Sequence, residues 1–246
     1  MNKMKWIMSV AVFAAAFCAM ASAEEDEEDM REFGGFVDVP PGGPAMLFVD
    51  ARSGGDGAVP AHVASTVRGM LKLGAESQTN AIAAGEAPYA RAVALRKASK
   101  GLLAVLLCNG AADDPALAVY PEERVAVVSA QAATAFAKGA EADKRLIKEI
   151  WRGIGFICGA GYDKRKAGVM QPVASPVELD LVEWQVIHPM SLGNMTKFLD
   201  KYGVKPSKRV MYKKAVEEGW APAPTNEYQK AIWDEIHSKT NAPAAK

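Results

Sequence analysis

Residues 142–159 restrict the possible folds of this chain more than any other stretch. Leu146, Ile150 and Ile154 recur there at helical spacing, and Asp143 lies near the start, where the positive end of a helix favours an acidic side chain. The second half of the stretch holds three glycines, and a glycine inside a helix costs about 1 kcal/mol relative to alanine. We therefore predict a buried amphipathic helix in which something other than helix propensity selects glycine.

Apolar runs and turn residues on either side of this helix predict an α/β or α+β domain. Short continuous runs rich in valine and leucine, bounded by turn residues, are typical of buried strands. Helical spacing of apolar residues, with proline near the start or glycine at the end, predicts further helices. The predicted strands are residues 45–51, 102–108 and 124–129, and the predicted helices are residues 60–73 and 89–97.

The sequence RGIGFICGAGY, at residues 152–162, resembles the HExxHxxGxxH zinc-binding motif of the metzincin metallopeptidases. Gly155 matches the glycine that often precedes the second histidine of that motif, and Gly159 matches the glycine at which the family's helix ends in a turn. Shortly afterwards, the sequence GVMQP at residues 168–172 resembles the Met-turn of the same family, with Met170 as its methionine.

The reactive positions of the motif all differ from the family pattern. Arg152, Phe156 and Tyr162 stand in place of the three histidines, and Gly153 stands in place of the glutamate that acts as general base. Arginine carries the same sign of charge as zinc, phenylalanine has no lone pair, and a single tyrosine does not retain zinc. Loss of the glutamate also removes the base for a zinc-bound water. The resemblance therefore implies no zinc, no other cofactor and no peptidase activity.

The resemblance covers residues 45–203 and implies a fold similar to the archaemetzincins and matrixins. That fold is an α+β sandwich with a twisted mixed sheet, long helices, a site helix, the Met-turn and a closing helix, which the resemblance places at residues 189–202. The prediction that follows is a pseudoenzyme, not an enzyme, that serves as a binding or structural module for an unknown protein or peptide partner. Two alternatives stay open: an exported hydrolase that uses other residues, and an unrelated α/β domain of an envelope assembly.

Other recognised catalytic and metal-binding patterns are absent from the sequence. It has no GxSxG motif, and His62, His188 and His237 have no partner at a metal-ligand spacing. Cys108 and Cys158 either form a disulfide or remain as two buried thiols. Basic and acidic side chains are equal in number, 29 of each, so the charge gives no reason to expect nucleic acid as a partner.

The N-terminus has the three parts of a cleavable export signal. Lys3 and Lys5 precede an uncharged apolar stretch, which runs into the small residues 21–23. Because this stretch is shorter than the roughly 20 residues that span a bilayer, we expect residues 1–23 to be removed. The mature protein is then periplasmic or extracellular, with no membrane span. Residues 24–44, which are acidic and then rich in proline and glycine, predict a disordered leader.

Residues 204–240, beyond the predicted domain, are expected to form a helical appendage. Residues 208–219 and residues 227–238 each have the amphipathic pattern of a short helix, and a proline-rich joint separates them. Trp220 and Trp233 are expected to pack this appendage onto the domain, because large aromatic side chains in short helices usually anchor them. Residues 241–246 are predicted to fray.

Overall fold

The computed structural model describes residues 36–163, 168–188 and 192–219, and a few residues between 223 and 234. They belong to two compact units: Pro40–Ser207, and a smaller unit formed from both ends of the chain. The predicted signal 1–23 and the tail 241–246 lie outside the described residues, as do most of the predicted leader 24–44 and His237.

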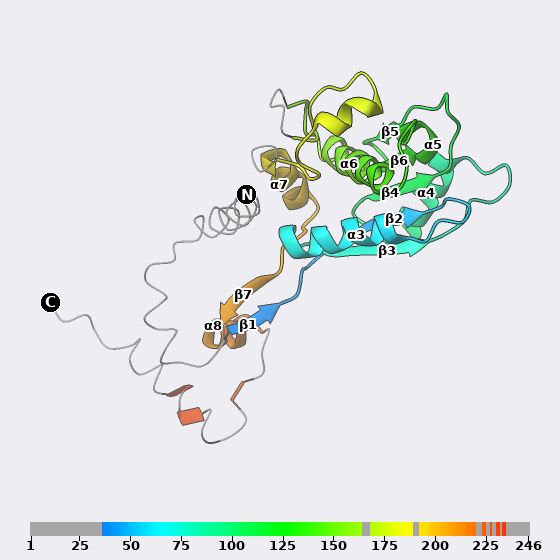
Figure 1. Ribbon diagram of the computed structural model, residues 1–246. Coiled ribbons are helices and arrows are strands. Elements are labelled where there is room, and N and C mark those ends of the chain that lie inside the picture. The colour runs from blue at the N-terminus through cyan, green and yellow to red at the C-terminus, as the bar shows by residue number, and fades with distance from the viewer. Residues whose placement is uncertain are drawn as a thin grey trace. The chain divides into compact units, whose positions relative to one another are not determined.

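The larger unit is built on a five-stranded sheet with the order β3-β2-β4-β6-β5 (Figure 1). Four strands are parallel, and the edge strand β5 runs antiparallel to β6. Every residue of β2, β4 and β6 is buried, as expected for parallel strands that helices cover on both faces. The strands are β2 (Met46–Asp50), β3 (Ala75–Thr79), β4 (Ala104–Cys108), β5 (Leu117–Tyr120) and β6 (Val125–Ser129).

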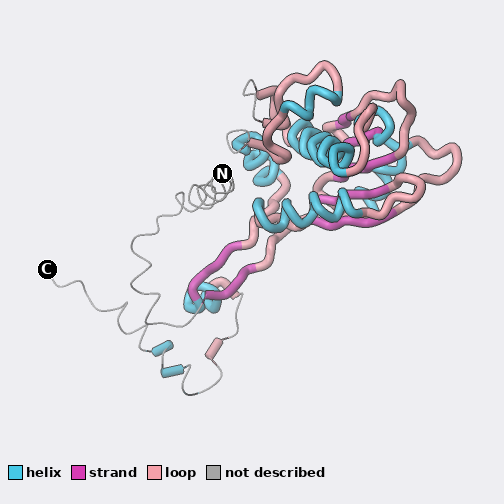
Figure 2. Tube along the Cα trace, in the orientation of Figure 1, coloured by secondary structure: helices cyan, strands magenta, loops and turns pink. Residues whose placement is uncertain are grey.

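Helices cover the two faces of this sheet, as Figure 2 shows. One face packs against α3 and α6, which contact each other, and the other face packs against α4. The helical elements are α3 (Ala58–Thr66) with the π-helical turn η1 (Val67–Leu71), α4 (Pro88–Ala98), α5 (Ala130–Ala133), α6 (Ala140–Ile157), the 3-10 helix η2 (Pro176–Leu181) and α7 (Leu192–Lys201). The protein is therefore a mixed α/β structure with a mainly parallel sheet.

The smaller unit contains a two-stranded antiparallel ribbon and a short helix. β1 (Phe36–Val39) pairs with β7 (Lys208–Met211), and α8 (Tyr212–Glu217) follows directly. β1 therefore lies within the segment 24–44, for which we predicted no fixed structure. The helix predicted over residues 208–219 is wrong for its first four residues, because their backbone pairs with β1.

The elements that bury continuous apolar runs agree best with the sequence prediction. The three predicted strands are confirmed as β2, β4 and β6, and the helices predicted at 60–73, 89–97, 142–159 and 189–202 correspond to α3 with η1, α4, α6 and α7. β3 and β5 were not predicted. Neither is a continuous buried run, since β3 is exposed at four of its five residues and β5 is only partly buried.

No helix among the described residues is both long enough and apolar enough to cross a membrane.

Candidate functional site: a cavity between β5 and α6

The glycines of α6 allow the helix to approach its neighbours closely. A Cβ atom added to Gly153 would lie 3.0 Å from Cβ of Ala126 in β6, and one added to Gly155 would lie 2.5 Å from Sδ of Met170. Gly159 has a φ of +76°, a conformation that favours glycine, and it follows directly on the end of the helix. Contact with the sheet and with Met170 therefore accounts for glycines that helix propensity disfavours.

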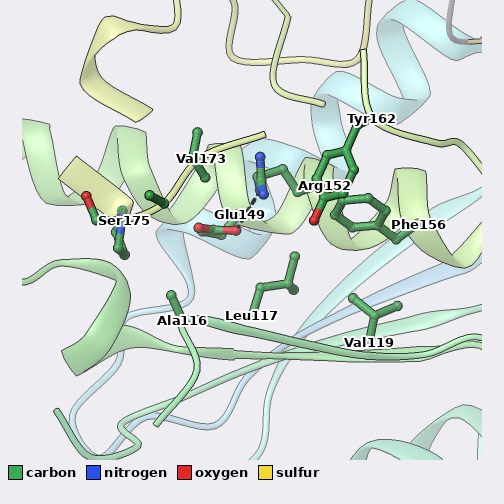
Figure 3. A pocket seen from close by; sticks show the side chains of 11 residues that line it. Ala116, Leu117, Val119, Glu149, Arg152, Phe156, Tyr162, Val173 and Ser175 are labelled. Carbon is green, nitrogen blue, oxygen red and sulfur yellow. Dashed lines mark ion pairs between the residues drawn. The ribbon is translucent and has the colours of Figure 1, made fainter. Parts of the chain in front are cut away.

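A cavity of about 410 Å³ lies beside this helix. Three parts of the larger unit form its walls: β5 with the residue before it, the second half of α6, and the chain that follows α6 (Figure 3). The residues that line it are Ala116, Leu117 and Val119, then Glu149, Arg152 and Phe156, and finally Tyr162, Val173, Ala174, Ser175 and Pro176. Its volume falls in the range of about 300–1,000 Å³ that is usual for ligand-binding cavities.

A buried ion pair forms part of this cavity's wall. Oε2 of Glu149 lies 3.2 Å from Nε of Arg152, and both side chains are less than one-tenth exposed. The N–H at Nε does not point at that oxygen, so neither atom has a hydrogen bond within the described residues. Burial raises the pKa of Glu149 above its ordinary value of 4.5, although the charge of Arg152 partly opposes the shift.

Arg152 also joins α6 to the chain around Met170. Its Nη1 donates to the carbonyl oxygens of Val169 and Gln171, at 2.9 and 2.8 Å. These two residues flank Met170, which is buried against Gly155. The guanidinium therefore fixes the segment after α6 to the same helix that carries the ion pair.

Two aromatic side chains lie at one end of the cavity. The rings of Phe156 and Tyr162 meet edge to face, with centroids 5.3 Å apart, and the guanidinium of Arg152 lies 5.7 Å from the Phe156 centroid. Figure 3 shows both rings at one end and Ser175 at the other. The structure thus brings together three of the predicted motif positions, Arg152, Phe156 and Tyr162, on one cavity.

The other predicted positions lie around this cavity but do not line it. Gly153 faces the sheet, Gly159 ends the helix, and Met170 is buried under the helix. These positions do not test whether the residues replace the zinc ligands of a metzincin, which stays a prediction.

The edge strand β5 has backbone groups that no other strand uses. The backbone N–H of Ser129 donates to the carbonyl of Ala116, and with the pairing register this directs the N–H and C=O groups of Ala118 and Tyr120 toward β6. The backbone groups of Leu117 and Val119 then point away from the sheet, and none of them has a hydrogen-bond partner among the described residues. Both residues line the cavity, so an open strand edge borders it.

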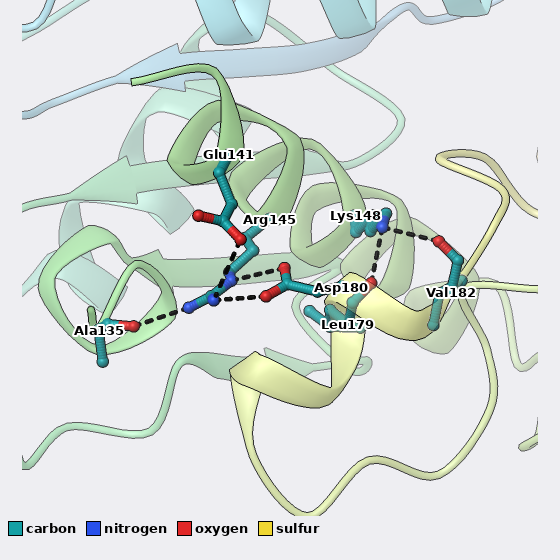
Figure 4. A network of polar contacts seen from close by, with 7 residues as sticks. All are labelled: Ala135, Glu141, Arg145, Lys148, Leu179, Asp180 and Val182. Carbon is teal, nitrogen blue, oxygen red and sulfur yellow. Dashed lines mark hydrogen bonds and ion pairs between the residues drawn. The ribbon is translucent and has the colours of Figure 1, made fainter. Parts of the chain in front are cut away.

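A second polar cluster, which the sequence analysis missed, lies nearer the start of α6 (Figure 4). Arg145 binds the carboxylate of Asp180 through two hydrogen bonds, of 2.8 and 2.6 Å, and donates a third to the carbonyl of Ala135. Nζ of Lys148 donates to the carbonyls of Leu179 and Val182. Arg145, Lys148 and Arg152 are three and four residues apart, which places all three on one side of the helix. This spacing could have indicated the cluster.

These contacts position the segment that carries the last cavity wall. The Arg145–Asp180 bond lowers the pKa of Asp180, and burial lowers the pKa of Lys148. Residues 173–175 lie between Gln171, which Arg152 holds, and η2, which Arg145 and Lys148 hold. The wall that these residues form is therefore held to α6 by Arg152 before it and by Arg145 and Lys148 after it.

The other sequence candidates lie away from this cavity or form no cluster. No three histidine, cysteine, aspartate or glutamate side chains gather as a metal site within the residues that the structure describes. Cys108 and Cys158 are both buried free thiols, and burial raises the pKa of Cys158 to about 12. The donor set of the cavity does not fit zinc either, because a guanidinium repels a cation and a phenyl ring offers no lone pair.

Two solved structures of other proteins are similar to this chain. No protein-family model matches the sequence, and no curated protein matches it. The chain is similar to a zinc-dependent peptidase from Methanocorpusculum labreanum, with 16% identity and a TM-score of 0.49, over 61% of this chain and 99% of that one. It is also similar to archaemetzincin from Methanopyrus kandleri, with 18% identity and a TM-score of 0.45, over 66% of this chain and 99% of that one.

Both structures belong to the class that the sequence resemblance named, the zinc metallopeptidases. The comparison contradicts our prediction that the protein is not an enzyme, since both similar structures are of peptidases, and that prediction is withdrawn. Similarity at this level concerns the course of the chain and not the residues of the site. It leaves the predicted loss of zinc ligands untested.

Proposed function

We propose that this protein binds an extended peptide segment, which adds to the sheet along β5 and places a side chain in the cavity beside α6. The observation that carries the proposal is the open edge of β5, where the outward backbone groups of Leu117 and Val119 border a cavity of about 410 Å³. An unpaired strand edge offers main-chain hydrogen bonds to any extended peptide, and adjacent pockets then select its side chains.

The walls of the cavity support a peptide ligand. Leu117, Val119 and Phe156 supply apolar surface, and the Glu149–Arg152 pair supplies a few polar groups at a fixed place. Binding sites for small ligands usually combine apolar walls with a small number of placed polar groups in this way. Because α6 fixes the pair and the segment after it, the site is formed before the ligand arrives.

Hydrogen exchange tests this proposal on the full mature chain. A library of unstructured heptapeptides is screened for binding, and exchange of backbone amides is then compared with and without a bound peptide. We expect the amides of Leu117 and Val119 to exchange rapidly in the free protein and to be protected by the peptide. The opposite edge strand, β3, is the internal control and should not change.

A variant sharpens the same test. Val119→Pro removes an outward N–H without removing a hydrogen bond to β6, so it should abolish peptide binding while β5 still pairs. Protection at β3 instead of β5, or unchanged binding by a folded Val119→Pro variant, would contradict the proposal.

Cleavage of the bound peptide is a second candidate function, favoured by Glu149. This carboxyl lines the cavity, and burial raises its pKa above the ordinary value, which is the direction of shift found in catalytic carboxyl groups. The test is a peptide-cleavage assay with the intact protein, with and without chelator, and with Glu149→Gln. Cleavage that this variant abolishes supports hydrolysis, and bound peptides that stay intact leave peptide binding as the function.

We also propose that α6 corresponds to the site helix of the metzincins, with its zinc ligands replaced. Support comes from the convergence of Arg152, Phe156 and Tyr162 on one cavity, with Met170 buried against the helix. Metal content of the purified protein, measured by mass spectrometry, should show no stoichiometric zinc. Zinc at one equivalent would contradict the proposed replacement.

The place of action is part of the proposal: the protein is exported and acts outside the cytoplasm. The N-terminal pattern of Lys3, Lys5, an apolar stretch and the small residues 21–23 supports it. N-terminal sequencing of the protein recovered from a secreting host should begin at Glu24. An intact Met1 in the recovered protein would contradict export by this signal.

A further inference from the structure

We propose that the cavity recognises a side-chain carboxamide, that of glutamine or asparagine, which contacts Glu149 and Arg152 together. The proposal rests on the peptide-binding function above and names the side chain that the cavity selects. Glu149 and Arg152 are the charged residues among those that line the cavity, so they determine which polar ligands it accepts.

The pair has hydrogen-bonding capacity that the described residues do not use. Of the three guanidinium nitrogens of Arg152, Nη1 has two carbonyl partners, while the buried Nε has no hydrogen bond in the described part of the chain. Oε2 of Glu149, which lies 3.2 Å from that Nε, likewise has no hydrogen-bond partner there. Buried polar groups are nearly always hydrogen-bonded, so an unused acceptor beside an unused donor favours a ligand that satisfies both.

The charge of the pair then selects among polar ligands. Glu149 and Arg152 together carry no net charge if both are ionised, and they are 97% and 94% buried. A lysine or arginine side chain would bring a second cation close to Arg152, and a glutamate or aspartate would bring a second carboxylate close to Glu149. Like charges are costly beside groups that are as buried as these two side chains. A neutral ligand with both a donor and an acceptor avoids either cost.

The shape of a primary amide fits this requirement. Its C=O and one N–H point to the same side, so the oxygen can accept from Arg152 while the nitrogen donates to Glu149. A trans backbone peptide group points its N–H and C=O in opposite directions and cannot contact both partners at once. Figure 3 shows Glu149 and Arg152 side by side, with Val173 on one side of the pair and Leu117 of β5 on the other in this view.

Four matched peptides test the proposal on the full mature protein. They share one sequence, taken from a peptide that binds β5, and differ at the residue that enters the cavity: glutamine, glutamate, lysine or methionine. Glutamine and glutamate have the same shape, and methionine has similar length without polar hydrogen-bond groups. At pH 7, we expect the glutamine peptide to bind at least about 10-fold more tightly than each of the others, because the others leave a buried polar group unpaired or add a charge.

A change of preference gives the second readout. Glu149→Gln keeps the volume of the side chain but removes its charge, so Arg152 is left unbalanced. The variant should bind the glutamate peptide more tightly than the glutamine peptide, the reverse of the parent protein. The matched control is Glu122→Gln, which alters an exposed glutamate that does not line the cavity and should leave the order of the four peptides unchanged.

The outcomes separate this inference from the proposed function. If peptides bind and protect β5 but the glutamine and methionine peptides bind equally, the carboxamide site is wrong and the peptide-binding function stands. If no peptide protects β5, the function and the inference that rests on it both fail. If Glu149→Gln folds with the parent's melting temperature but keeps the parent's order of preference, recognition by Glu149 is wrong.

Discussion

The two ends of α6 use buried cations in different ways. At the first end, Arg145 is matched: its guanidinium meets the Asp180 carboxylate in two hydrogen bonds and the Ala135 carbonyl in a third. At the second end, Arg152 has two carbonyl partners but only a poorly directed contact with Glu149. The first cluster is complete within the chain, and the second borders a cavity of about 410 Å³.

This difference separates a structural network from a candidate binding site. A buried polar network whose groups are satisfied holds the structure in one arrangement, and Arg145 with Asp180 fixes η2 on α6 in this way. A network with unused donors and acceptors at a cavity can take up a ligand without breaking an internal bond. The same helix therefore has one end that fixes the cavity wall and another that supplies the cavity's polar groups.

The largest effect is expected from removing Arg152. Arg152→Met would leave the buried carboxylate of Glu149 without its cation and the carbonyls of Val169 and Gln171 without their donor. Removing one partner of a buried pair typically costs about 3–5 kcal/mol, and we expect a loss of this size in the free energy of unfolding, measured by urea denaturation.

The double variant Glu149→Gln with Arg152→Met provides the control for that measurement. It removes the stranded charge as well as the cation, so it should be more stable than Arg152→Met alone. A cost below about 1 kcal/mol for the single variant would show that Glu149 does not depend on Arg152.

A smaller loss is expected at the complete end of the helix. Arg145→Met leaves Asp180 without its partner, but the Asp180 side chain is 30% exposed and water can replace part of the lost interaction. We expect a cost of about 2–3 kcal/mol by the same denaturation measurement. The neighbouring Lys144 is exposed, so Lys144→Met should change stability by less than about 0.5 kcal/mol.

Peptide preference distinguishes the two ends further. Arg145→Met should leave the order of the four peptides unchanged, because Arg145 does not line the cavity. A reversed order in this variant would mean that the two clusters are not independent.

The central strands and α6 could be predicted from the sequence because their residues repeat a strong pattern. β2, β4 and β6 are continuous apolar runs, and α6 carries apolar residues at helical spacing. β3 could not be predicted, because it lies at an edge of the sheet and its sequence AESQT is mostly polar and exposed. β7 resembled part of a helix, since its strand pairing depends on residues 36–39, far away in the sequence.

The candidate site was predictable only in part. The spacing of Arg152 and Phe156, four residues apart, places them on one side of a helix, and the motif resemblance added Tyr162. Glu149 gave no signal of its own, because glutamate in an amphipathic helix is usually on the solvent side. Glu149 is buried because the segment after α6 folds back over this helix. The spacing of apolar and polar residues in that segment, 168–182, does not predict that it packs against Glu149. Leu117 and Val119 were not predicted as cavity residues, because β5 was not predicted as a strand.

Alanine at Gly155 should have a moderate effect and test how tightly the second end of α6 is packed. A Cβ atom at Gly155 would meet Sδ and Cε of the buried Met170 at 2.5 and 2.8 Å, so that side chain must move. Overpacking of this kind costs about 1–3 kcal/mol, and alanine returns about 1 kcal/mol of helix propensity. We expect Gly155→Ala to lower the free energy of unfolding by about 1 kcal/mol.

Gly193 in α7 is the matched control, because a Cβ atom there meets nothing within 4 Å. Gly193→Ala should be neutral or slightly stabilising. A stabilised Gly155→Ala variant would show that the contact between α6 and Met170 is looser than the structure has it.

The smallest effects are expected in the pH dependence of stability, with opposite signs at the two ends of α6. The hydrogen bonds from Arg145 hold the pKa of Asp180 below its ordinary value of 3.8. The stability that Asp180 contributes is therefore present above pH 3.8 and is lost as the pH falls through the lower pKa of the folded state. Burial raises the pKa of Glu149 above 4.5, so its contribution is present below pH 4.5 and is lost as the pH rises through the folded-state pKa.

Urea denaturation at a series of pH values tests both signs with two isosteric variants. Asp180→Asn should flatten the loss of stability below pH 3.8, an effect of less than about 1 kcal/mol because the side chain is partly exposed. Glu149→Gln should flatten the loss above pH 4.5. If both variants flattened the acid side, Glu149 would be a satisfied carboxylate like Asp180, and the contrast between a complete and an incomplete cluster on one helix would not hold.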